Sequence, residues 1–137
     1  DLICAIATPA VQTAANITAD IPIVATAVTD YEAAKLVKNV AEPGTNVTGT
    51  TDMNPVGKQL ELLLQIVPQA KTIGTIYSSS EVNSQLQVAL LKQVAAEKGI
   101  TVREATVSNV NDIVKGFKAT LSKRFAGMKI MFGKPIG

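Results

Sequence analysis

Two stretches of the sequence decide the fold: LICAIA at residues 2–7 and TIGTIY at residues 72–77. Each is a short, mainly apolar run, which is typical of a strand buried in a parallel sheet. A loop with hydroxyl side chains follows each run, Thr8-Pro9 in the first case and Ser78–Ser80 in the second, and a helical segment begins there. Open α/β sheets bind ligands outside the carboxyl ends of their strands, where a helix N-terminus favours an anion. The two edges therefore predict two facing sides of a ligand-binding cleft.

Strands and helices alternate along the rest of the chain. The other predicted strands are at residues 23–28, 47–50, 100–107 and 129–132. The predicted helices are at residues 10–16, 31–40, 55–67 and 81–98, with a further one after residue 112. This order predicts an α/β fold of parallel sheets with right-handed crossovers and helices on both faces.

Capping residues stand where these helices are expected to begin. Thr8 is the expected N-cap of the first helix, with Pro9 in its first turn. Residues 52–54 are the expected cap of a later helix, in which Pro55 takes the first position. Thr29-Asp30 offers a cap for the predicted helix at residues 31–40.

Composition narrows the class of protein. The 137 residues are 47% hydrophobic and carry a formal net charge of +2, which fits one globular chain without a basic patch. Nucleic acid and anionic membranes are therefore not expected partners, and no apolar run is long enough to span a bilayer. Cys4 is the single cysteine, so no internal disulfide can form, and its apolar surroundings predict a small buried hydrophobe.

The residues that most enzymes depend on are missing. The chain has no His, which removes the commonest general base and a common metal ligand. No nucleophile elbow, Walker loop or dinucleotide-binding glycine loop follows either strand. Neither a metal nor a cofactor is therefore expected, and no catalytic residues are assigned.

The chemistry that is present consists of hydroxyls, amides and helix N-termini. A helix start with a Thr or Ser beside it presents free N–H donors and a hydroxyl, and it accepts a carboxylate without an Arg. Tyr77 ends its strand beside the serines and could form a wall of a pocket. The alternative is structural: the polar residues cap their own helices, and Tyr77 packs on the following helix.

Four motifs, in order, resemble one protein family: AIATPAVQ at residues 5–12, IPIV with AVTD at residues 21–30, PGTNVTG at residues 43–49, and KTIGTIY at residues 71–77. Asn83-Ser84 fits the same pattern. The chain from Asp1 to about Val114 is similar to the substrate-binding proteins of bacterial ABC transporters of the tryptophan or aromatic amino-acid type. Each motif is weak alone, whereas the ordered set is specific.

The resemblance implies a type I periplasmic-binding-protein fold with two α/β lobes and a cleft that closes on a ligand. Residues 1–50 would belong to the first lobe and residues 51–137 to the second. The residues that the resemblance assigns to ligand binding are Thr8, Ala27, Val28, Thr29, Tyr77, Ser79, Ser80, Asn83 and Ser84. It also implies an ABC permease as partner and an extracytoplasmic location, as a lipoprotein or in the periplasm.

The chain departs from the family pattern at both ends. The family's first strands and helices are expected before Asp1, and the basic stretch from about residue 122 is atypical of the family. The leading hypothesis is capture of a small solute, an amino acid, for an ABC uptake transporter. Two alternatives remain open: a fragment of an α/β enzyme whose catalytic residues lie elsewhere, and a non-binding fragment that self-associates through unpaired sheet edges.

Overall fold

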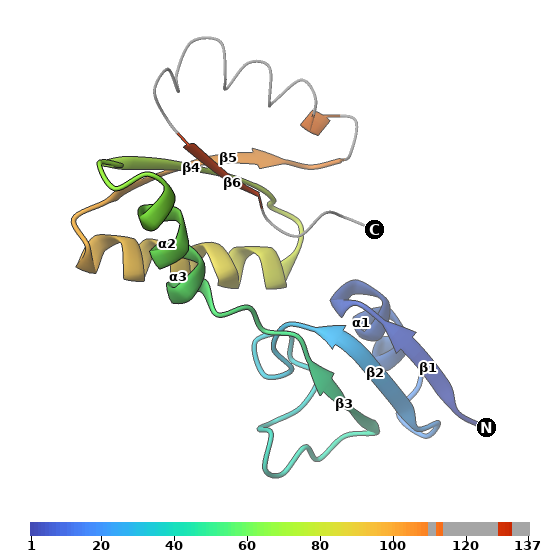
Figure 1. Cartoon of the computed structure of the whole chain (residues 1–137). Helices are drawn as coiled ribbons and strands as arrows, with labels where there is room; N and C mark the ends of the chain where they lie inside the picture. Colours follow the sequence, from blue (N-terminus) through green and yellow to red (C-terminus); the bar gives the residue numbers. More distant parts are fainter. Residues whose placement is uncertain (110–111, 114–128, 133–137) are drawn as a thin grey trace. The chain divides into compact units, whose positions relative to one another are not determined.

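The computed structural model describes residues 1–109, 112–113 and 129–132, and the chain divides into two compact units (Figure 1). Unit 1 is Asp1–Asn54 and unit 2 is Pro55–Gly137. Each contains a three-stranded sheet in which every strand pair is parallel. The predicted α/β class with parallel sheets is confirmed. The helix predicted after residue 112 lies largely outside the described residues, as does most of the stretch from residue 122.

Unit 1 is built on a sheet with the order β1-β2-β3. Its elements in chain order are β1 (Ile3–Ile6), α1 (Thr8–Ile17), β2 (Ile23–Val28) and β3 (Val47–Thr51). Ala5 of β1 lies opposite Ala25 of β2, which lies opposite Gly49 of β3. Position 49 requires glycine, because a Cβ there would overlap the Ala25 carbonyl and the Tyr31 hydroxyl.

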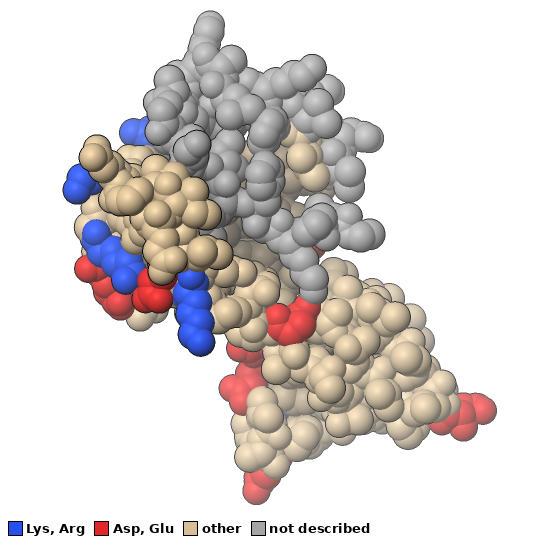
Figure 2. Space-filling model, in the orientation of Figure 1, with Lys and Arg blue, Asp and Glu red and all other residues tan. Residues whose placement is uncertain are grey.

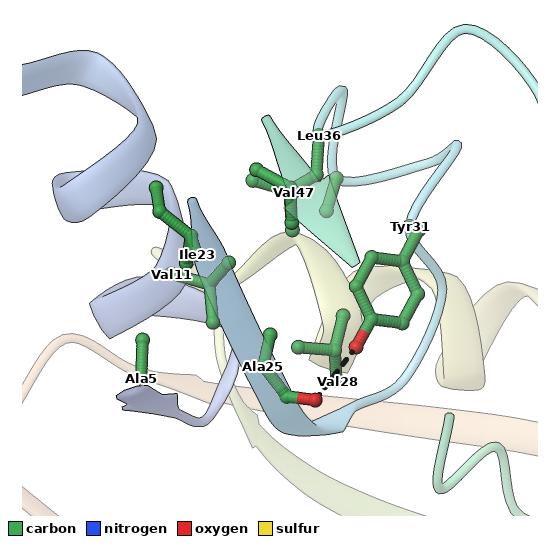
Figure 3. Close-up of a cluster of buried hydrophobic side chains, with 9 residues drawn as sticks. Ala5, Val11, Ile23, Ala25, Val28, Tyr31, Leu36 and Val47 are labelled. Carbon is green, nitrogen blue, oxygen red and sulfur yellow. Dashed lines mark hydrogen bonds between the residues drawn. The ribbon is translucent and has the colours of Figure 1, made fainter. Parts of the chain in front are cut away.

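The unit 1 core lies on the face of the sheet that α1 covers (Figure 3). Alternate residues of the strands point toward α1, where Val11 is fully buried. The core residues that the close-up labels are Ala5, Val11, Ile23, Ala25, Val28, Tyr31, Leu36 and Val47.

The opposite face of this sheet is exposed among the described residues. Ile6 is 63% exposed and Val24 is 41% exposed. Cys4 belongs to the same alternate row and is also exposed, so the prediction of a buried cysteine is wrong. The apolar run predicted a strand correctly, but it did not reveal that only one face of that strand is covered.

The predicted helix at residues 31–40 is also wrong, because this segment forms a series of turns. Asp30 Oδ1 accepts the N–H groups of Glu32 and Ala33 at 2.9 Å each, which starts one helical turn. Lys35 then takes a positive φ of 58°, and the helix does not continue. The Tyr31 hydroxyl donates toward the Ala25 and Thr50 carbonyls, at 3.3 and 3.1 Å, which fastens this loop to the sheet.

Unit 2 has the strand order β5-β4-β6. Its elements are α2 (Val56–Ile66), β4 (Thr72–Ser78), α3 (Val82–Glu97), β5 (Thr101–Val107) and β6 (Lys129–Phe132). The strands predicted at residues 72–77, 100–107 and 129–132 are thereby confirmed. The helix α2 begins after Pro55, which is its N-cap and makes no side-chain cap bond, so the predicted cap at residues 52–54 is wrong.

The unit 2 core lies between the sheet and the two helices, which lie on the same side of it in Figure 1. Leu60 of α2, Ile73 of β4 and Ala95 of α3 have no exposed surface and pack in one cluster. No helix of the described residues is long and apolar enough to cross a membrane.

Candidate functional site

Thr8 lies at the carboxyl end of β1, as the first residue of α1. It is 2% exposed, and its Oγ1 has no hydrogen-bond partner among the residues that the structure describes. The N-cap is Ala7, so the prediction that Thr8 caps the helix is wrong. A buried hydroxyl without a partner loses its bonds to water, a cost of about 1–3 kcal/mol. The hydroxyl lies in the first turn of α1, where Pro9 has no N–H and the N–H groups of Thr8 and Ala10 have no intrahelical acceptor, and this end of a helix favours an anionic ligand.

At the end of β2, the backbone is more available to a ligand than the side chains are. Val28 is fully buried in the core, so its side chain is not available to a ligand. Thr29 is also buried, and its carbonyl accepts the Thr51 hydroxyl at 2.7 Å. Ala27 is half-buried with a positive φ of 56°, where the register between β2 and β3 shifts.

The loop between β4 and α3 is fastened by its own polar groups. Ser78 Oγ and Ser80 Oγ lie 2.9 Å apart, in a hydrogen bond whose donor either can be. Ser79 is exposed, its N–H donates to the Val107 carbonyl at 3.2 Å, and its carbonyl accepts Gln85 Nε2 at 2.7 Å. Glu81 is the N-cap of α3 and makes no side-chain cap bond, so the serines do not cap this helix.

Asn83 and Ser84 lie in the first turn of α3. Ser84 donates to Glu81 Oε2 at 3.3 Å. Asn83 Oδ1 has no exposed surface and no hydrogen-bond partner within the described residues. Asn83 therefore carries an unused acceptor at the start of α3, as Thr8 carries an unused hydroxyl at the start of α1.

Tyr77 is held by a network on the side of the sheet where α3 packs. Its hydroxyl donates to Glu104 Oε2 at 2.9 Å, and Lys92 Nζ donates to Glu104 Oε1 at 2.7 Å. The hydrogen bond from Lys92 lowers the pKa of the Glu104 carboxyl. The hydrogen bond to Glu104 raises the pKa of the Tyr77 phenol and that of the Lys92 ammonium. The sequence indicated the position of Tyr77 at the end of its strand, but it did not indicate Glu104.

Charges and metal ligands are sparse at the two edges. Residues 1–54 contain two Lys, no Arg and six Asp or Glu, so an anion at α1 would depend on N–H groups and hydroxyls. On the face that Figure 2 shows, Lys and Arg side chains lie on unit 2 beside acidic ones. No group of three or more His, Cys, Asp or Glu in the described ranges could hold a metal ion.

Comparisons with known proteins identify relatives. The family model described as ABC transporter substrate binding protein matches residues 1–132. The tyrosine-binding protein of Clostridioides difficile (strain R20291) is 45% identical over 123 residues, which cover 90% of this chain and 36% of that protein.

Two solved structures are also similar. One is an ABC domain in complex with L-Trp from Streptococcus pneumoniae, with a TM-score of 0.89 and 43% identity over 96% of this chain and 45% of that one. The other is a conserved domain protein from Vibrio cholerae, with a TM-score of 0.85 and 43% identity over 88% of this chain and 40% of that one. The chain spans less than half the length of these relatives.

Proposed function

Because this chain belongs to the family of ABC transporter substrate-binding proteins, we propose that it is part of a protein that captures an amino acid for an ABC permease. One relative is named for tyrosine and another was solved with L-Trp, which supports an aromatic amino acid as the solute. Family membership favours solute binding over the enzyme alternative.

The observation that carries this proposal is the hydroxyl of Thr8. It is buried and has no hydrogen-bond partner among the described residues, and it lies in the first turn of a helix, where the N–H groups of Thr8 and Ala10 have no intrahelical acceptor. The N–H groups donate and the hydroxyl can donate, and a carboxylate accepts several hydrogen bonds. We assign the solute's carboxylate to this edge, with Ala27, Val28 and Thr29 beside it through their backbone.

The edge of unit 2 offers the complementary chemistry. Asn83 Oδ1 is a buried acceptor with no partner within the described part of the chain, and an ammonium group is a donor only. The proposed contacts on this side are Tyr77, Ser79, Ser80, Asn83 and Ser84. That the two edges face one another across a cleft remains a prediction.

The other expectations from the resemblance are kept as proposals. Residues 1–50 would be part of the first lobe and residues 51–137 part of the second. The whole protein would act outside the cytoplasmic membrane, as a lipoprotein or in the periplasm. The exposed face of the unit 1 sheet supports self-association of this chain.

Calorimetry with free amino acids and their amides tests the proposed function. L-Trp and L-Tyr are expected to bind at least about tenfold more tightly than their amides, because an amide loses the charge-assisted bonds of a carboxylate. Equal affinity for acid and amide would contradict the assignment of the carboxylate to α1. If a full-length protein that contains this chain binds none of these compounds, the proposed function is contradicted.

A further inference from the structure

We propose that Ala7 is a positioning residue of the amino-acid site, whose strained backbone holds Thr8 and the first N–H groups of α1 ready for the ligand. The inference rests on the proposed function and adds to it a residue that contributes no side-chain contact. It starts from the backbone of Ala7, which has a φ of 74° and a ψ of 147°. Only glycine adopts such angles readily, because a Cβ crowds the adjacent backbone.

Hydrogen bonds on both sides hold Ala7 in this conformation. Its N–H donates to the Thr26 carbonyl of β2 at 3.0 Å, and its carbonyl accepts the Val11 N–H of α1 at 3.2 Å. The residue is thus tied to the sheet before it and to the helix after it. Strain that the surroundings impose in this way is concentrated at ligand-binding and catalytic sites.

A second strained residue lies next to the same bond. Ala27, which follows Thr26, has a φ of 56°. Within the described residues, three residues other than glycine have a positive φ, and the third is Lys35 in the loop after β2. Of these three, Ala7 is the donor of the bond to Thr26 and Ala27 directly follows its acceptor, at the sheet edge to which the ligand is assigned.

The consequence of the strain appears at the next residue. Thr8 enters the helix directly from Ala7 and is 2% exposed, and its Oγ1 has no partner in the ranges that the structure describes. A relaxed junction would allow the first turn of α1, with the Thr8 side chain on it, to take several orientations relative to the sheet, whereas the hydrogen bonds on both sides of Ala7 hold one of them. By fixing the junction, Ala7 keeps the hydroxyl free for a ligand, and the ordering cost is met before binding.

The substitution Ala7→Gly separates positioning from structure. Glycine takes these angles without strain, so the melting temperature is expected to stay the same or rise. The junction becomes freer, so affinity for L-Trp or L-Tyr is expected to fall about fivefold. A merely structural residue would move stability and affinity in the same direction.

The matched control is Lys35→Gly, which relieves a positive φ of 58° away from the strand ends. It is expected to preserve or raise the melting temperature and to leave affinity unchanged. If Ala7→Gly binds as tightly as the parent chain, or if it loses stability and affinity together, the inference is overturned while the proposed function stands. If a full-length protein that contains this chain binds neither amino acid, both are overturned.

Discussion

The hydroxyl of Thr8 contrasts with that of Thr13 on the same helix. Thr13 is exposed and bonds back to the Pro9 carbonyl, as threonines in helices commonly do. Thr8 is buried and bonds to nothing among the described residues. An unpaired buried hydroxyl destabilises the free protein, and a hydrogen bond from this hydroxyl to a ligand would remove that cost.

Thr8→Val tests this difference, because valine has a similar shape and lacks the hydroxyl. The free energy of unfolding is expected to stay the same or rise, since an unpaired buried polar group is removed. Binding of an amino acid is expected to weaken by about 1.5–3 kcal/mol, the value of a hydrogen bond to a charged group. Urea unfolding and calorimetry measure the two effects.

The control is Thr13→Val, which removes an exposed hydroxyl from the same helix and should leave affinity unchanged. A Thr8→Val protein that loses stability but binds normally would show that this hydroxyl has a structural partner and no role in binding.

At the level of elements, the network of Tyr77, Glu104 and Lys92 joins β4, β5 and α3. The folded state lowers the pKa of the Glu104 carboxyl from its ordinary value of 4.5, chiefly through the hydrogen bond from Lys92. Its contribution to stability is therefore present above about pH 4.5 and is lost as the pH falls through the lowered value. The pKa values of Tyr77 and Lys92 are raised from 10.0 and 10.5, so their contribution is lost as the pH rises above that range.

Glu104→Gln is expected to lower stability near neutral pH and to flatten its dependence on pH at both ends. The measurement is the urea midpoint of unfolding between pH 3 and pH 11, a range that spans the ordinary pKa values of the three groups.

Lys92→Met should likewise flatten the dependence of stability on pH at acidic pH. High salt should weaken the effect in the parent chain, because both side chains of the ion pair are partly exposed. A Glu104→Gln profile parallel to that of the parent would show that the network contributes nothing.

At the level of the whole chain, the open face of the unit 1 sheet has consequences for assembly. Parallel sheets are usually covered on both faces, whereas the described residues cover one face of this sheet. Leu2, Ile6 and Val24 are exposed there or beside it, at 64%, 63% and 41%. Cys4 lies opposite Val24 in the sheet and is the single cysteine of the chain.

We therefore expect the isolated chain to form dimers or larger assemblies through this face. Light scattering at micromolar concentration measures the assembly, and mild oxidation should link two copies through Cys4. Val24→Lys should reduce both, because it places a charge on the face. Ile17→Lys should change neither, because Ile17 is exposed at the end of α1, outside the sheet. A stable, cooperative monomer would contradict this prediction.

Much of the candidate site was predictable and some of it was not. The sequence indicated that Thr8 and the loop after Tyr77 follow strands and precede helices, because apolar runs, hydroxyl residues and helix starts are local signals. It could not indicate that Thr8 Oγ1 lacks a partner among the described residues, that Ala7 is strained, or that Glu104 accepts a hydrogen bond from Tyr77. Each of these depends on residues brought together from separate elements.

The sequence by itself determined the α/β class, the parallel strands and the family, because these follow from short apolar runs and from motifs in a fixed order. The tertiary structure decided two features that the same sequence patterns predict wrongly, the conformation of residues 31–40 and the exposure of Cys4. Residues 31–40 have helical spacing, but the left-handed Lys35 ends the helical turn that begins at Asp30, and the Tyr31 hydroxyl fastens the segment to the sheet. Cys4 lies in an apolar run, but α1 covers only the face that Ala5 occupies. A local preference amounts to tenths of a kcal/mol per residue, and burial and long-range hydrogen bonds outweigh it.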